Sequence, residues 1–227
     1  MTEEATMGQM IEFQSPNEQI LKGYLATAGQ GRPGIVVLQE WWGLNAQLKG
    51  VADRFAAAGY NALVPDLYKG RVTQDPDEAN HLMNGLDFPG ATHQDIHGAV
   101  RHLKTLGGKV GVMGYCMGGA LTIAAAVHVP EVDAAASLYG IPPAAFAAPK
   151  NIRVPFQGHF ANQDTWCTPA AVNQLEDAMR AAGMAPEIFR YDAAHAFCNE
   201  ARPEVYNAAF ATQAWDRMLN FFATHLR

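Results

Sequence analysis

The chain has 227 residues, 49% of them hydrophobic and 17% charged, which is enough apolar material for one well-packed α/β core. We therefore expect residues 1–227 to form a single domain. The formal net charge of −6 gives no electrostatic basis for binding nucleic acid or an anionic membrane. No apolar run approaches the ~20 residues of a membrane span, so we expect no membrane partner.

The N-terminal stretch MTEEATMGQM carries acidic residues and has no apolar core, so we do not expect it to be a signal peptide. The three cysteines are odd in number and lack paired spacing, which argues against a disulfide framework. These features favour a cytoplasmic, reducing location, in which a reactive thiol persists.

The first half of the chain alternates short apolar runs with helical patterns. A β-hairpin is predicted over Met10–Ser15 and Gln19–Ala26, with its turn at Pro16-Asn17. The continuous apolar run Ile35–Leu38 is typical of a central parallel strand. The elements predicted after it are a helix over Asn45–Ala58, a strand over Tyr60–Val64, a loop over Leu67–Pro76, and helices over Asp77–Asn84 and Thr92–Leu106.

The second half repeats this alternation. The predicted strands are Val110–Met113, Ala134–Leu138, Val154–Gly158 and Pro186–Tyr191, and the predicted helices are Gly119–Val127, Thr168–Ala182 and Glu204–His225. Strands that alternate with helices predict an α/β fold with a mostly parallel sheet covered by helices on both faces. In such folds the functional site lies at the carboxyl ends of the strands.

The stretch KVGVMGYCMGG, Lys109–Gly119, has the form G-x-C-x-G, a nucleophile elbow with a cysteine at its apex. Gly114 and Gly118 lie two residues either side of Cys116, where a side chain would collide as strand and helix close over the turn. The helix N-terminus is expected to favour the thiolate of Cys116 over its thiol. The structural alternative is a tight packing turn with a buried cysteine.

A thiol nucleophile needs a base, and the base needs an orienting carboxylate. His195, in the loop YDAAHAFCNE, is the candidate base, with His159 as a weaker rival among the eight histidines. Two acids compete for the third role. Both fit the order nucleophile, acid, base, and Asp164 is favoured over Asp192 because it lies in the loop GHFANQDTWCTP after a strand, which suits a residue that reaches across to a histidine.

Glu40 follows a predicted strand directly and is the fourth candidate catalytic residue. Near Cys116 it could accept the thiol proton or hold the thiol in a resting position; the alternative is a surface glutamate. The backbone N–H groups of Trp41 and Met117 are the candidate oxyanion hole. Because Glu40, Cys116, Gln163-Asp164 and His195 all follow strand ends, one crevice could hold them all.

Other features have simpler interpretations. His93 and His97 are spaced i, i+4 but lack a third ligand, so we interpret them as a solvated helix face and expect no metal and no other cofactor. Cys167 and Cys198 are interpreted as small packing residues. Six aromatic residues flank the candidate site in sequence and could line an apolar pocket or belong to the core: Trp41, Trp42, Tyr115, Phe160, Trp166 and Phe197.

The motifs QEWWGLN (39–45), PDLY (65–68), GYCMGG (114–119), QD (163–164) and HAF (195–197) resemble the dienelactone hydrolases, or carboxymethylenebutenolidases, of the α/β-hydrolase superfamily. The resemblance implies an α/β-hydrolase fold without a large cap domain. It also implies a triad of Cys116, His195 and Asp164 with Glu40 as an auxiliary group. The candidate substrate-binding residues are Tyr68, Arg71, Tyr115, Tyr139, Phe197 and Asn199.

The chain departs from this family at two substrate-binding arginines. One is shifted in register, where the chain reads Lys69-Gly70-Arg71, and the other is replaced by Asn199. A neutral ester or lactone therefore becomes a candidate beside an anionic lactone. The expected function is cofactor-independent hydrolysis of a small-molecule ester or lactone through a covalent cysteinyl intermediate. The alternatives are a broad-specificity carboxylesterase that also attacks activated phosphotriesters, and a non-catalytic scaffold that binds a ligand.

Overall fold

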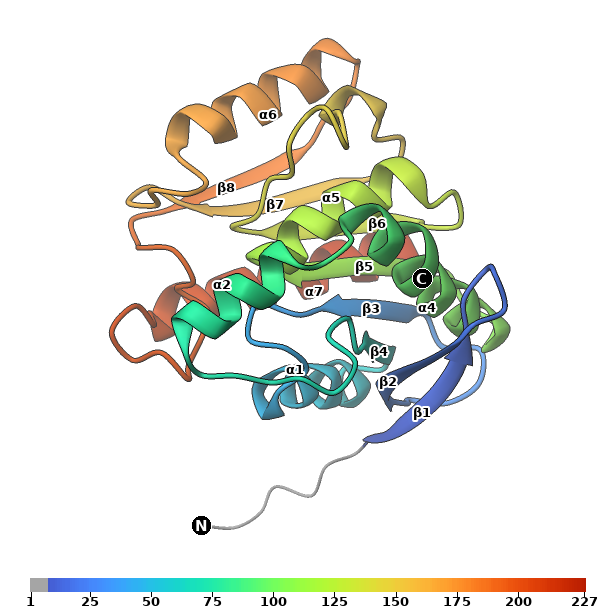
Figure 1. The fold of residues 1–227 in the computed structure, drawn as a ribbon. Coiled ribbons are helices and arrows are strands. Elements are labelled where there is room, and N and C mark those ends of the chain that lie inside the picture. The colour runs from blue at the N-terminus through green and yellow to red at the C-terminus, as the bar shows by residue number, and fades with distance from the viewer. Residues whose placement is uncertain (1–7) are drawn as a thin grey trace.

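The computed structural model describes residues 8–227. The signal-peptide expectation concerns mainly residues 1–7, which lie outside the described residues. The centre of the structure is an eight-stranded sheet in the order β1-β2-β4-β3-β5-β6-β7-β8 (Figure 1). The strands are β1 Gly8–Gln14, β2 Ile20–Ala26, β3 Gly34–Leu38, β4 Asn61–Pro65, β5 Val110–Tyr115, β6 Ala134–Leu138, β7 Phe156–Ala161 and β8 Glu187–Tyr191.

The hairpin β1–β2 and the pair β2–β4 are antiparallel, and the remaining neighbours from β4 to β8 are parallel. The prediction of a mostly parallel sheet behind an N-terminal hairpin is confirmed. Every residue of β3, β5 and β6 is buried. The continuous apolar runs in the sequence arise because both faces of these central strands are covered.

The helices form two layers on the sheet (Figure 1). Phe55 of α1 and Phe222 of α7 belong to the core on one face, while Leu103 of α4 and Leu121 of α5 belong to the core on the other. The helices are α1 Ala46–Ala57, α2 Pro76–Asn84, α3 Phe88–Gly90, α4 His97–Thr105, α5 Met117–His128, α6 Pro169–Ala181 and α7 Ala208–Leu226, with a π-helical turn η1 at Ala91–Ile96 and a 3₁₀ turn η2 at Pro149–Asn151. Among the described helices, none combines the length and apolarity needed to cross a bilayer.

Several boundaries differ from those predicted, for local reasons. Helix α5 begins at Met117 rather than Gly119, because the N–H of Ala120 already donates to the carbonyl of Cys116 at 3.0 Å. Helix α7 begins only at Ala208, where the side chain of Asn207 caps it. Strand β7 extends to Ala161, three residues beyond the predicted end, so it carries the chain further toward the loop that contains Asp164.

Candidate active site

The turn between β5 and α5 forces Cys116 into a left-handed backbone conformation with φ 54°. A Cβ atom at Gly114 would overlap the carbonyl oxygen of Gly118, and one at Gly118 would overlap the carbonyl oxygen of Leu38. The steric requirement predicted for the two glycines is confirmed. The result is a sharp strand-to-helix elbow with Cys116 at its apex.

The thiol of Cys116 is buried, and its pKa is raised well above the ordinary value, first by burial and then by the negative charge of Glu40. A hydrogen bond from the backbone N–H of Met117 acts in the opposite direction but does not prevail. The helix N-terminus therefore favours the thiolate, as expected, but burial and Glu40 outweigh it, so the thiol form prevails. Desolvation disfavours the charged sulfur more than the helix favours it.

His195 and Asp164 are paired, as the chain-order rule predicts. Nδ1 of His195 lies 2.7 Å from Oδ2 of Asp164, and the other oxygen of Asp164 accepts hydrogen bonds from the backbone N–H groups of Trp166 and Cys167, at 2.7 and 3.0 Å. Burial alone would raise the pKa of Asp164, but the bond to His195 and these N–H groups lower it. The carboxylate is thus held ionised and oriented toward His195.

Asp192 and His159, the alternative candidates for the acid and the base, make contacts outside the candidate triad. Asp192 is exposed and accepts a hydrogen bond from the side chain of Gln163 at 2.9 Å. His159 is fully buried, with its ring nitrogens 2.7 Å from the hydroxyl of Tyr191 and 2.8 Å from Oε1 of Gln157. Burial lowers the pKa of His159 to about 3, so its ring stays neutral at physiological pH.

Glu40 is not a surface glutamate, since its side chain is only 3% exposed. Asn199 donates from Nδ2 to Oε2 of Glu40 at 2.7 Å, and the hydroxyl of Tyr139 donates to Oε1 at 3.3 Å. Burial raises the pKa of Glu40, although these two hydrogen bonds and the charge of His195 partly offset that effect. Asn199 therefore contacts the auxiliary carboxylate.

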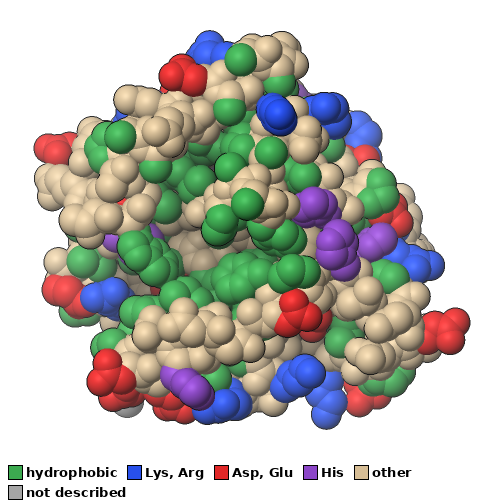
Figure 2. Space-filling model, turned by 45° about the horizontal axis from the view of Figure 1, so that its top comes forward, with side chains coloured by type: hydrophobic (Ala, Val, Ile, Leu, Met, Phe, Trp, Pro, Cys, Tyr) green, Lys and Arg blue, Asp and Glu red, His purple; other side chains and the backbone are tan. Residues whose placement is uncertain are grey.

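One small cavity of about 180 Å³ brings together the four candidate catalytic residues, Glu40, Cys116, Asp164 and His195, with Trp41, Trp42, Trp166 and Arg202 among the others that line it. The single crevice expected from the strand ends is thus present. A second cavity of about 470 Å³ also reaches Cys116. Hydrophobic side chains gather around the hollows on the face of the molecule shown in Figure 2.

Of the six flanking aromatic residues, three line the small cavity and three belong to the core. Trp41, Trp42 and Trp166 line the small cavity, with the rings of Trp41 and Trp166 6.4 Å apart. The other three are buried in the core: Tyr115, Phe160 and Phe197. Phe197 packs on Tyr139 and Tyr191, at ring distances of 5.5 and 4.8 Å. Phe197 and Tyr115 therefore line neither cavity beside Cys116, whereas Tyr139 lines the larger one.

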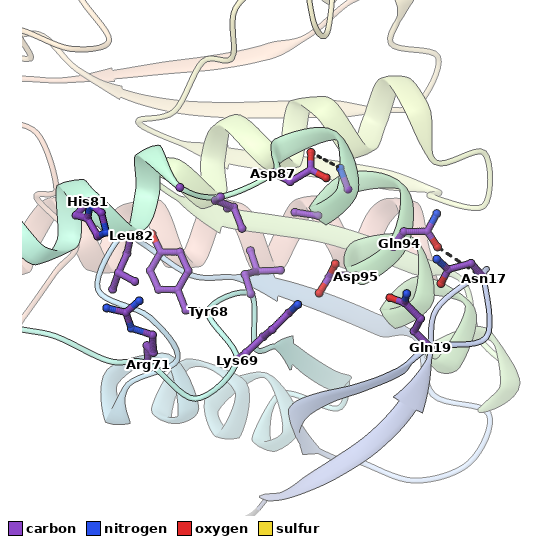
Figure 3. Close-up of a pocket in the computed structure, with 15 residues that line it drawn as sticks. Asn17, Gln19, Tyr68, Lys69, Arg71, His81, Leu82, Asp87, Gln94 and Asp95 are labelled. Carbon is purple, nitrogen blue, oxygen red and sulfur yellow. Dashed lines mark hydrogen bonds between the residues drawn. The ribbon is translucent and has the colours of Figure 1, made fainter.

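Tyr68 and Arg71 line a third cavity of about 530 Å³, which does not include Cys116 (Figure 3). Arg71 makes an exposed ion pair with Glu78 at 3.4 Å. The hydroxyl of Tyr68 donates to Sδ of Met117 at 3.3 Å. Tyr68 therefore contacts the side chain of Met117, whose backbone N–H is a candidate donor of the oxyanion hole. The turn at Lys69, with φ 53°, carries Arg71 away from the nucleophile, which corrects its predicted place in the substrate pocket.

Arg202 was not identified from the sequence. Its side chain lines the small cavity, forms an ion pair with Glu204 and lies 5.9 Å from the ring of Trp42. It comes seven residues after His195, in a loop whose path the sequence pattern does not reveal.

His97, which was interpreted as part of a solvated helix face, pairs with Glu131 at 2.8 Å on a partly exposed face of α4.

A mostly parallel sheet with helices on both faces, a strained elbow between β5 and α5, and an acid–histidine pair following β7 and β8 define an α/β-hydrolase. Comparison with known proteins narrows the class. The chain belongs to the dienelactone hydrolase family, whose model matches residues 21–226. It is accordingly a hydrolase that acts on ester bonds.

Individual relatives agree with this assignment. The chain is 34% identical to a protein of Aquifex aeolicus named provisionally as a carboxymethylenebutenolidase, over 97% of this chain and 100% of the relative. It is equally similar to protein usf of Aquifex pyrophilus, with the same coverage. Among solved structures, a protein of Klebsiella pneumoniae named provisionally as a dienelactone hydrolase superposes with a TM-score of 0.85 and 25% identity, covering 96% of this chain and 99% of that one.

A second solved structure shares the fold at 20% identity. It is described as the dienelactone hydrolase-like promiscuous phosphotriesterase P91 from metagenomic libraries, and its TM-score is 0.85, with 97% of this chain and 100% of that one covered.

Proposed function

We propose that the chain hydrolyses esters or lactones, without a cofactor, through a triad of Cys116, His195 and Asp164 and a covalent cysteinyl intermediate. The observation that carries this proposal is the 2.7 Å bond between His195 and Asp164 beside a cavity that also holds Cys116. Because Nδ1 of His195 faces Asp164, its Nε2 is free to exchange a proton with the thiol.

In the first half-reaction, Sγ of Cys116 bonds to the substrate carbonyl carbon as the thiol proton passes to Nε2 of His195. The carbonyl oxygen becomes an oxyanion, and the N–H groups of Trp41 and Met117 are the proposed donors to it. The tetrahedral intermediate collapses when the bond from carbon to the alkoxy oxygen breaks. The imidazolium of His195 protonates that oxygen, and a thioester on Cys116 remains.

In the second half-reaction, His195 takes a proton from water as the water oxygen attacks the thioester carbon. The second tetrahedral intermediate expels the sulfur of Cys116, which recovers the proton from His195, and the acid product leaves. Asp164 stays ionised throughout and stabilises the imidazolium.

Glu40 has two effects in this scheme. Its charge raises the pKa of Cys116 and so keeps the resting thiol protonated. The same charge attracts the imidazolium of His195 that forms in the first half-reaction. Glu40 thus restrains the nucleophile at rest and assists once substrate is bound. A cytoplasmic location, predicted from the cysteine content, would protect such a thiol from oxidation.

The proposal is tested by turnover and by trapping. The purified protein is assayed with p-nitrophenyl esters, lactones and activated phosphotriesters, and the quenched reaction is examined by mass spectrometry. We expect a burst of product and an acyl adduct on Cys116. Cys116→Ala should abolish turnover, whereas Cys167→Ala and Cys198→Ala should keep most of it.

Normal activity in Cys116→Ala would refute the cysteinyl mechanism. No turnover of any substrate by the wild type would instead favour a non-catalytic scaffold. Turnover of phosphotriesters in addition to esters would place the chain among the broad-specificity enzymes, since an oxyanion hole can stabilise charge developing on a phosphoryl oxygen.

A further inference from the structure

Two cavities of different character meet at Cys116. The larger, of about 470 Å³, is lined mainly by apolar side chains from α2, α3, the segment between them and the loop after β6, including Met83, Leu86, Phe88, Ile141, Pro142 and Pro143. The smaller, of about 180 Å³, holds the charged groups Glu40, Asp164, His195 and Arg202. Among the described residues, only Cys116 and Trp166 line both. The nucleophile therefore lies at the junction of an apolar and a polar space.

The chemistry of acyl transfer assigns one part of the substrate to each space. The alkoxy oxygen must lie within hydrogen-bond reach of the base that protonates it. His195 lines only the smaller cavity, so the alcohol portion of a bound ester occupies that side. The acyl chain is attached to the opposite side of the same carbonyl carbon, which directs it into the larger cavity.

We infer that the substrate is an open-chain ester with an extended apolar acyl group and a short, polar alcohol group. This inference rests on the proposed function. None of the residues that line the larger cavity is Asp, Glu, Lys, Arg or His, so it offers an acyl chain hydrophobic burial and no charged partner. The smaller cavity is enclosed by three tryptophans and limits the size of the alcohol. A lactone, whose ring joins both groups, cannot fill both spaces in this way.

Two series of neutral esters test the assignment. In the first, the alcohol is constant and the acyl group lengthens from acetate to butyrate and hexanoate. The value of kcat/KM should rise by up to ~4-fold for each methylene buried, or about two orders of magnitude from acetate to hexanoate. In the second, the acid is butyrate and the alcohol lengthens from methanol to butanol and hexanol, and kcat/KM should stay level or fall.

A variant narrows the larger cavity. Ile141→Trp introduces a bulky ring into its wall, at a partly exposed position where it can be accommodated. It should lower kcat/KM for the hexanoate ester by about tenfold or more and that for the acetate ester by less than about twofold. The matched control is Ile20→Trp, because Ile20 is 58% exposed on β2 and lines none of the three cavities described above. This control should leave the whole series unchanged.

The outcomes separate this inference from the proposed function. Turnover that rises with alcohol length and not with acyl length would overturn the assignment of the two cavities while leaving the triad intact. An equal loss on acetate and hexanoate in folded Ile141→Trp would also overturn it, as would lactones that outperform every open-chain ester. Absence of turnover with all esters and lactones would instead refute the proposed function itself.

Discussion

Three residues around the candidate site hold left-handed backbone conformations that side chains rarely adopt: Cys116, Tyr139 and Ala196, with φ of 54°, 41° and 64°. Each follows a strand or adjoins the candidate base, and strain of this kind persists where the surrounding structure holds it in place. Cys116 and Tyr139 each carry a polar group of the site, and Ala196 directly follows His195 in the chain. The site is thus built on backbone positions that tight packing determines.

At the residue scale, the role of Asp164 gives a direct prediction. Asp164→Asn should lower kcat by about 10⁴, because an amide cannot hold His195 in the required tautomer. Asp192→Asn is the matched control, since Asp192 is exposed and accepts its hydrogen bond from the side chain of Gln163 rather than from His195. Steady-state kinetics on one neutral ester measures both. A damaging Asp192→Asn beside a nearly silent Asp164→Asn would reverse the assignment.

The restraint that Glu40 places on the thiol is a second residue-scale prediction. Glu40→Gln removes the largest cause after burial that raises the pKa of Cys116, so the thiolate should form at lower pH than in the wild type. The inflection in the rate of alkylation by iodoacetamide should shift downward in pH. Turnover should fall nevertheless, because the imidazolium of His195 loses a neighbouring negative charge. An alkylation profile that does not move would show that Glu40 does not restrain the thiol.

The identity of the triad could be predicted from the sequence because it depends on residue type and order along the chain. Cys116 lies in a recognisable elbow, and both Asp164 and Asp192 satisfy the order nucleophile, acid, base. The position of Asp164 in a loop after an earlier strand is what favours it over Asp192. Arg202 and the place of Arg71 could not be predicted in this way. Both depend on how an irregular loop turns, and one residue in a left-handed conformation, such as Lys69, redirects everything after it.

At the scale of elements, the starts of the central buried strands and of α1, α2 and α6 were predictable to within one residue, whereas the starts of α5 and α7 were not. The runs in β3 and β6 are apolar because both faces are covered, so their positions agree with the sequence pattern to within one residue. The segment η1 is π-helical before it continues as α4. A π-helical segment of six residues is little more than one turn, which is too short for the apolar spacing to distinguish it from an α-helix.

The elbow also provides an element-scale prediction of stability. Gly118→Ala places a Cβ atom against the carbonyl oxygens of Leu38 and Gln39, and overpacking of this kind costs about 1–3 kcal/mol. The matched control is Gly50→Ala in the middle of α1, where a Cβ atom meets nothing within 4 Å. That change should stabilise the protein by about 0.5–1 kcal/mol. Urea unfolding measures the free energy of unfolding of both variants. If the two variants were equally stable, the elbow would accommodate the added methyl group without an energetic cost.

At the scale of the whole molecule, charge is unevenly distributed around the candidate site. The net charge is −6, and the larger cavity beside Cys116 has no charged residue in its lining. Asn199, which stands where the family pattern has a cation, is buried, donates to Glu40 and carries no charge to pair with a substrate carboxylate. Arg202 is the one cation among the residues that line the two cavities at the nucleophile, and it lies on the polar side.

A carboxylate on the substrate should therefore lower kcat/KM, and by more when it lies on the acyl chain than when it lies on the alcohol. The p-nitrophenyl monoester of glutarate, with its charge on the acyl chain, should have a kcat/KM about one to two powers of ten below that of p-nitrophenyl pentanoate, since no cation offsets the loss of hydration. The butyrate ester of glycolate, with its charge on the alcohol, should lose less relative to ethyl butyrate, because Arg202 can pair with it. Arg202→Gln should enlarge the second penalty and leave the first unchanged. If the wild type instead prefers the glutarate ester strongly, a cation reaches the acyl chain from outside the larger cavity, and the expected preference for neutral esters is wrong.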